Sequence, residues 1–108
     1  MNETLREMAG APVGTITLGG RTYRLRELNW NDYCEIEAAF GKDPDEWRGM
    51  RAARFILWLG LRKEDPSLTL ERVGELVSVS EFEAAAEAID RLMGHDPNEE
   101  ATDDPKNG

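Results

Sequence analysis

The chain has 108 residues and a formal net charge of -9, with 22 acidic and 13 basic residues. This length fits one domain, and the charge has the wrong sign for a protein that grips phosphates, so we expect no nucleic-acid partner. A single cysteine excludes an internal disulfide framework and favours the cytoplasm. No apolar run approaches the roughly 18 residues of a membrane span, so we expect no membrane partner.

The first element is predicted to be a β-hairpin over residues 13–28, after a flexible N-terminus over residues 1–12. Apolar and polar residues alternate on both sides of the pair Gly19-Gly20, which supplies the positive φ angles of a two-residue primed turn. The alternating apolar residues are Val13, Ile16, Leu18, Tyr23 and Leu25. Because a lone hairpin is marginally stable in water, one face of it must pack on the helices that follow.

Four helices are predicted next, over residues 30–40, 44–62, 69–77 and 80–93. Capping side chains near Asn29 begin the first helix, and Asp43 followed by proline begins the second. Thr69 caps the third, and Ser80 with Glu83 makes a capping box for the fourth. The expected fold is therefore α+β and mostly helical, with the hairpin packed on a small bundle of about four helices.

The folded domain is predicted to cover residues 13–94. The remaining residues 95–108 have the sequence HDPNEEATDDPKNG. Their only apolar residues are one alanine and two prolines, and the only larger ring is that of the histidine. Burial of so little apolar surface cannot offset the entropy lost on ordering. We therefore predict a disordered acidic C-terminal tail.

The second helix carries the run FILWL and is apolar on nearly every side, which is typical of a central core helix. We expect Phe55, Leu57 and Leu61 to be core residues. The last helix is different, because its apolar residues form one stripe beside an acidic face, as in an amphipathic surface helix. That stripe consists of Phe82, Ala85, Ala86, Ile89, Leu92 and Met93.

One quadrant of the second helix is a candidate partner-binding surface. A helical wheel places Trp47, Arg51, Arg54 and Trp58 together, and Trp and Arg are enriched at interface hot spots. The alternative, which the residue types favour, is structural. In it the arginines pair with acids of the neighbouring helices while their aliphatic stems cover the tryptophans.

Catalytic and metal-binding patterns are absent from the sequence. His95 is the only histidine and lies at the edge of the tail, so no Ser-His or Cys-His pair can be built on a rigid scaffold. Cys34 is predicted to be a small core residue of the first helix. No spacing resembles a zinc site or a calcium loop. We predict no enzymatic activity, no cofactor and no metal.

Two stretches of the chain, ITLGGRTYRLRELNWNDYCEIEAAFG and RAARFILWLGLRKEDPSLTLERVGELV, resemble the small tail assembly chaperones of long-tailed bacteriophages. In that family a hairpin with an LGG-type turn leads to a glutamate-rich helix, and a helix with a pattern like LLWxGLxxEDPxLTxEExGEL follows. The similarity covers about residues 16–93 and is most specific over 58–76. Arg72 departs from the pattern, where the family often has an acid.

The resemblance implies a non-catalytic chaperone that binds and solubilises the tape measure protein during tail assembly. It would act in the cytoplasm of the infected bacterium and be absent from the mature virion. A longer form made by ribosomal frameshifting would recruit tail tube subunits, and Asp104-Pro105-Lys106 permits a slippery codon heptamer. Self-association into a homo-oligomer stays open.

Two other classes of function fit a small acidic protein. An inhibitor that occupies the basic channel of a host nucleic-acid-binding enzyme would present its acids on one folded face, whereas here nearly half of the net charge belongs to the tail. A structural connector subunit of the virion would assemble as a ring and stay in the purified particle.

Overall fold

The computed structural model describes residues 12–95, and the predictions for residues 1–11 and 96–108 lie outside this range. The chain begins with an antiparallel hairpin of β1 (Pro12–Leu18) and β2 (Arg21–Arg26). Leu18 pairs with Arg21 across Gly19-Gly20, whose φ angles are 57° and 83°, so the predicted primed turn is confirmed. The strand starts at Pro12, which was predicted to belong to the flexible N-terminus.

The inner face of the hairpin is buried, as the alternation predicted. Ile16, Leu18, Tyr23 and Leu25 are at most 4% exposed and belong to the hydrophobic core. Arginines of β2 pair with acids of the loop after α3. The ion pairs are Arg21 with Asp65 and both Arg24 and Arg26 with Glu64. The hairpin is thus held by the apolar contacts of its inner face and by ion pairs with this loop.

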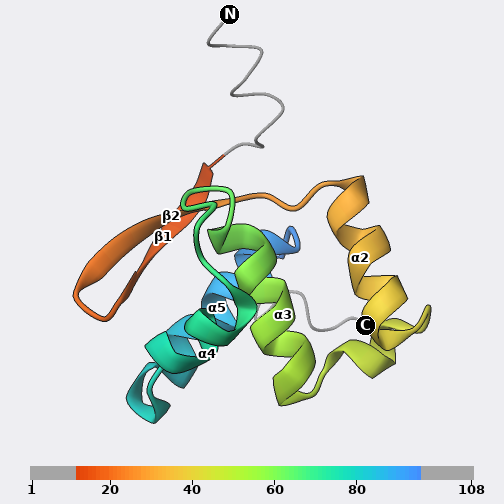
Figure 1. Cartoon of the computed structure of the whole chain (residues 1–108). Helices are drawn as coiled ribbons and strands as arrows, with labels where there is room; N and C mark the ends of the chain where they lie inside the picture. The colour runs from red at the N-terminus through yellow and green to blue at the C-terminus, as the bar shows by residue number, and fades with distance from the viewer. Residues whose placement is uncertain (1–11, 96–108) are drawn as a thin grey trace, which may run out of the picture.

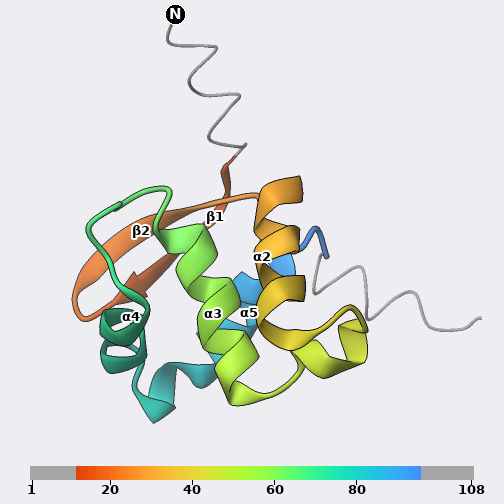
Figure 2. The same cartoon turned by 45° about the vertical axis from the view of Figure 1, so that its right-hand side comes forward.

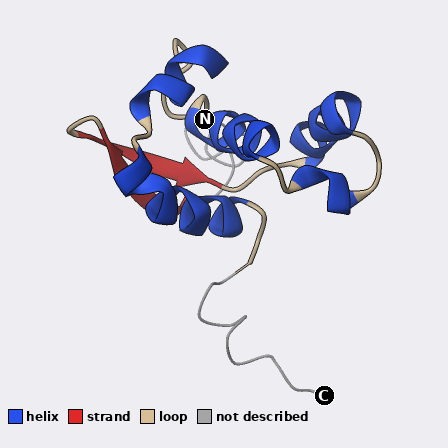
Figure 3. Cartoon of the chain, turned by 90° about the horizontal axis from the view of Figure 1, so that it is seen from below, coloured by secondary structure: helices blue, strands red, loops and turns tan. Residues whose placement is uncertain are grey.

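Four α-helices follow: α2 (Trp30–Phe40), α3 (Met50–Leu61), α4 (Leu70–Leu76) and α5 (Phe82–Leu92). Two short 3-10 helices, η1 (Pro44–Trp47) and η2 (Val79–Glu81), precede α3 and α5. Helix α3 lies at the centre, between the hairpin on one side and α2 on the other, with α5 behind it (Figure 1, Figure 2). Seen from below, the hairpin lies at one end of the molecule and α2 with η1 at the other (Figure 3). The predicted class, a hairpin on four helices, is confirmed.

The helix predicted over residues 44–62 is wrong at its start. Asp43 accepts a hydrogen bond from the Asp45 N–H, but this cap begins only the single turn of η1. Gly49 then takes an extended conformation with ψ of 175°, and α3 begins at Met50. Glycine loses more backbone entropy on entering a helix than any other residue, which disfavours a continuous helix through this position. Trp47 therefore lies outside α3.

The predicted capping box of the last helix is also wrong. Ser78 and Glu81 form the box, with the Ser78 N–H donating to Glu81 Oε1 at 3.0 Å, and α5 begins at Phe82. The segment SVSEFE contains the serine–glutamate spacing twice, at residues 78 and 81 and again at Ser80 and Glu83. Both registers satisfy the same local rule, so the rule alone does not choose between them.

Helices α3 and α5 approach closely at Gly60 and Leu92. Gly60 is buried, and a Cβ atom built on it would lie 2.5 Å from Leu92 Cδ2, so only a glycine allows the two helices to come this close. The Leu28 N–H donates to the Leu92 carbonyl at 3.2 Å, which ties the end of the hairpin to the end of α5. Leu57 and Leu61 are buried as predicted, and Phe55 is partly buried. Between residues 12 and 95 no helix has the length and apolar character to cross a membrane.

Candidate binding groove

An open apolar groove of about 690 Å³ runs between α3, α4 and α5. Its volume lies within the range of sites that bind ligands or peptides. The lining comes from three separate segments of the chain. These residues are Met50, Arg51, Ala53, Arg54 and Leu57 of α3; Val73, Gly74 and Val77 at α4; and Phe82, Ala85, Ala86 and Ile89 of α5.

The groove has a buried floor and an exposed apolar rim. Leu57 and Val73 form the floor and are 2% and 1% exposed. Met50 and Phe82 stand on the rim and are 69% and 44% exposed. Isolated exposed apolar residues are common on protein surfaces, but here they border one continuous apolar hollow. The groove is therefore the strongest candidate for a binding surface within residues 12–95.

The groove opens between the N-terminal halves of α3 and α5, away from the close contact at Gly60 and Leu92. Its lining spans residues 50–57 of one helix and 82–89 of the other, and seven residues of helix advance by about 10 Å. Four members of the predicted apolar stripe of α5 face this groove, and Ala86 is exposed. The stripe was thus a sequence signal for the groove, although it was interpreted only as an amphipathic surface.

Two arginines stand on the groove wall formed by α3. Arg51 and Arg54 are exposed and line the groove. The side chain of Arg54 lies over Gly74 of α4, because a Cβ atom built on Gly74 would lie 3.1 Å from Arg54 Cδ. No carboxylate of residues 12–95 is within ion-pair distance of either guanidinium. The predicted pairing of these arginines with neighbouring helices is therefore wrong within the described chain.

The two tryptophans of the predicted quadrant lie elsewhere. Trp47 of η1 stacks on Tyr33 with ring centroids 6.3 Å apart, and its Nε1–H donates to the Gly41 carbonyl at 2.9 Å. Burial raises the pKa of the Tyr33 hydroxyl, and the carboxylates of Glu27 and Asp32 raise it further. These contacts connect α2 with η1 and do not approach the groove.

Trp58 of α3 is fixed by contacts within the fold. Its Nε1–H donates to the Leu68 carbonyl at 3.1 Å, and the Arg62 guanidinium lies 4.7 Å from its ring centroid. The structural alternative thus describes Trp58 well, but the covering arginine is Arg62 instead of Arg51 or Arg54. The four residues predicted to share one surface are divided among three environments. That Arg51 and Arg54 bind a partner stays a prediction.

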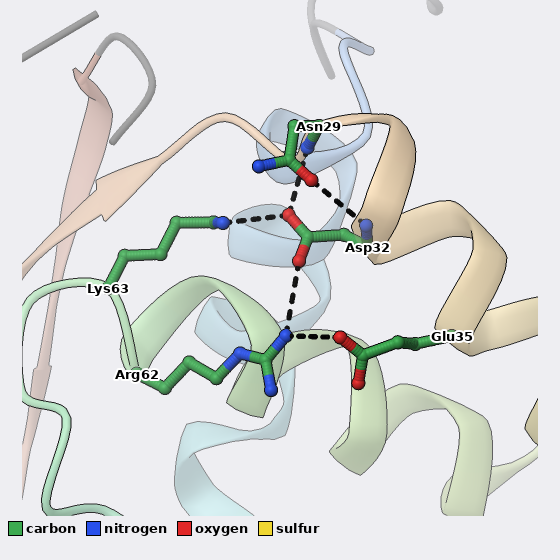
Figure 4. Close-up of polar contacts among 5 residues, drawn as sticks. All are labelled: Asn29, Asp32, Glu35, Arg62 and Lys63. Carbon is green, nitrogen blue, oxygen red and sulfur yellow. Dashed lines mark hydrogen bonds and ion pairs between the residues drawn. The ribbon is translucent and has the colours of Figure 1, made fainter. Parts of the chain in front are cut away.

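A buried carboxylate lies on the far side of α3 from the groove lining. Asp32 is 2% exposed, and its oxygens accept from the Asn29 N–H at 2.9 Å and pair with Lys63 at 2.8 Å and Arg62 at 3.3 Å (Figure 4). Arg62 also pairs with Glu35 at 2.7 Å. Because both oxygens are already engaged, we assign Asp32 to holding the start of α2 on the end of α3.

Other chemistry-bearing side chains are scattered. In the part of the chain that the structure describes, no three His, Cys, Asp or Glu side chains are grouped so that they could hold a metal ion. Cys34 is exposed on α2, so its prediction as a core residue was wrong, because the buried side of that helix is occupied by Ile36 and Asp32. His95 is exposed at the end of the described residues.

Comparison with protein-family models, with curated proteins and with solved structures finds no match for this chain.

Proposed function

We propose that this protein is a non-catalytic chaperone that holds an amphipathic helix of another protein in the groove between α3, α4 and α5. The observation that carries the proposal is the groove itself, with Leu57 and Val73 as its floor and exposed Met50 and Phe82 at its rim. Amphipathic helices insert apolar side chains spaced three, four and seven residues apart into grooves of this kind. A length of about 10 Å accommodates two turns of such a helix.

The proposed client is the tape measure protein of a long-tailed bacteriophage. This identification depends on the similarity of the hairpin and of the segment from α3 to α4 to tail assembly chaperones. Each copy would contact only about two helical turns, so each contact is weak and reversible. Many copies could then cover a long helical client and leave it when tube subunits assemble, which keeps the chaperone out of the mature virion.

The charge of the chain supports the same function. A net charge of -9 keeps a protein with an exposed apolar groove from self-association, and it would keep a coated client dispersed in the cytoplasm of the infected host. An inhibitor of a nucleic-acid-binding enzyme would also be acidic. The open apolar groove favours a helical client over a basic channel.

The test is co-expression with the tape measure protein encoded by the same genome, followed by measurement of the client in the soluble fraction. Ala86→Glu places a charge in the groove lining without removing any core side chain. Ala84→Glu is the matched control, because Ala84 is exposed on the same helix and does not line the groove. We expect wild type and Ala84→Glu to keep the client soluble and Ala86→Glu to lose it, with all three proteins melting alike.

Two results would contradict the proposal. An insoluble client beside the wild-type protein would exclude the tape measure protein as the partner. A client that is equally soluble with Ala86→Glu would exclude the groove as the binding site.

A further inference from the structure

We infer that the groove selects a helix whose apolar face is flanked by carboxylates, and that Arg51 and Arg54 form ion pairs with these carboxylates. The inference rests on the proposed function and adds the charge pattern of the client to it. The two arginines would determine which amphipathic helix binds and how tightly, whereas the apolar floor would bind any amphipathic helix.

The first observation is the contrast between these arginines and most of the other arginines of residues 12–95, Arg91 being the exception. Arg21, Arg24 and Arg62 each have a carboxylate partner from another part of the fold. Arg51 and Arg54 are exposed, line the groove and have no ion-pair partner among residues 12–95. In a chain with 22 acidic residues, two unpaired cations side by side make a local positive edge on an acidic molecule.

The second observation is the geometry of this edge. Arg51 and Arg54 are three residues apart on α3, so their Cβ atoms are about 5 to 6 Å apart on one face of the helix. Carboxylates three or four residues apart on a docked helix have the same spacing. Such a helix would place its apolar side chains over Leu57 and Val73 while its acidic flank lies along the α3 wall. Opposite charges arranged in this way increase the specificity of binding more than they increase its affinity.

The chemistry of the groove favours a separate helix over the acidic end of this chain. Residues 96–108 contain carboxylates but no apolar side chain larger than proline. That segment matches the arginines and leaves the apolar floor unfilled. A client helix with both an apolar face and an acidic flank matches both parts of the groove.

The experiment uses three fluorescein-labelled 18-residue peptides with the same leucine and alanine face. Their flank positions carry Glu, Gln or Lys, and binding to the full chain is measured by fluorescence anisotropy. We expect the Glu peptide to bind wild type roughly 3- to 30-fold tighter than the Gln peptide, the range given by two partly exposed ion pairs. The Lys peptide should bind most weakly.

The double variant Arg51→Glu/Arg54→Glu should reverse this order and prefer the Lys peptide. Its control is Arg48→Glu/Arg72→Glu, which changes the net charge equally at two exposed arginines outside the groove. The control should keep the preference for Glu. If the double reversal does not fold, Arg51→Gln/Arg54→Gln should bind the Glu and Gln peptides equally.

Four results would overturn the inference. Equal binding of all three peptides to wild type would leave a helix-binding groove without charge selection, so the proposed function would stand. A reversed order in the control variant would show that only net charge matters. A wild-type dimer that Ala86→Glu converts to a monomer, in sedimentation velocity, would identify a second copy as the occupant. If no peptide binds wild type at all, the proposed function fails together with the inference.

Discussion

The two ends of α3 differ although both are rich in apolar residues. At the C-terminal end, Leu59, Gly60 and Leu61 are fully enclosed by the fold. At the N-terminal end, Met50 is 69% exposed and Arg51 is exposed beside it. We call residues 50–54 the open end of α3, and residues 59–61 together with Arg62 and Lys63, which follow the helix, the closed end. An apolar helix pattern therefore indicates that a surface tends to be buried, but not whether residues of the same chain or of a partner bury it.

Helix α5 repeats the contrast. Leu92 at its C-terminal end is fully buried against Gly60, whereas Phe82 at its N-terminal end is 44% exposed. The open ends of the two helices form the groove. The comparison predicts that substitutions at the closed end lower stability and that substitutions at the open end lower binding.

The largest loss of stability is expected for Leu25→Asp, in the hairpin that packs on the helices. Leu25 is fully buried, so the variant places a carboxylate in an apolar site without a partner. The cost is several kcal/mol, enough to unfold a typical domain. Circular dichroism should show loss of the cooperative thermal transition. An unchanged melting temperature would mean that the hairpin does not contribute to the core.

A smaller loss is expected for Asp32→Ala, which removes the ion pairs with Arg62 and Lys63 at the closed end. The variant leaves the Lys63 ammonium poorly solvated, with its side chain only 11% exposed, and removes one of the two hydrogen bonds of the capping box of α2, the one from the Asn29 N–H. The expected cost is about 3 kcal/mol in urea unfolding. Glu35→Ala is the control, because its pair with Arg62 is more exposed and is expected to contribute less than about 1 kcal/mol. Equal effects of the two variants would refute a special role for Asp32.

Gly60→Ala should cost about 1 to 3 kcal/mol, because the new methyl group overlaps Leu92 in a packed core. The double variant Gly60→Ala/Leu92→Ala tests this cause. If the clash with Leu92 is responsible, the double variant is more stable than the sum of the two single effects predicts. Strict additivity in chemical denaturation would show that the destabilisation has another origin.

The smallest change in stability is expected for Met50→Ser at the open end. Most of this side chain is already in contact with water, so the free energy of unfolding should change by less than about 0.5 kcal/mol. Affinity for an amphipathic helix should fall, because Met50 lines the groove. A loss of stability comparable to that of Gly60→Ala would remove the distinction between the two ends.

Local chemistry predicted much of this fold. The Gly19-Gly20 pair requires no tertiary contact to form its turn, since glycine adopts positive φ without strain. Asn29 and Thr69 cap helices through hydrogen bonds within three residues. Thr69 was predicted as a cap, and for the first helix several capping side chains from Asn29 onward were predicted. The range 30–40 predicted for α2 agrees with the structure because its signals are short-range.

Where the local sequence allows more than one structure, the tertiary structure decided which one forms. The serine–glutamate spacing fits two registers, and the chain uses Ser78 instead of Ser80. The helical wheel grouped Trp47 with Trp58, but the break at Gly49 directs Trp47 to Tyr33. A wheel assumes one continuous helix, so it fails wherever the backbone changes direction.

The sequence by itself therefore determined the hairpin, the class of fold and the starts of α2 and α4, because these depend on backbone preferences over a few residues. Only the tertiary structure decided where the apolar surface stays open. The floor of the groove joins Leu57 with Val73, and its far wall is Ile89, residues that no local pattern relates to one another. Their meeting depends on how α3, α4 and α5 pack together, and the missing side chain of Gly60 is what lets α3 and α5 approach closely at Leu92.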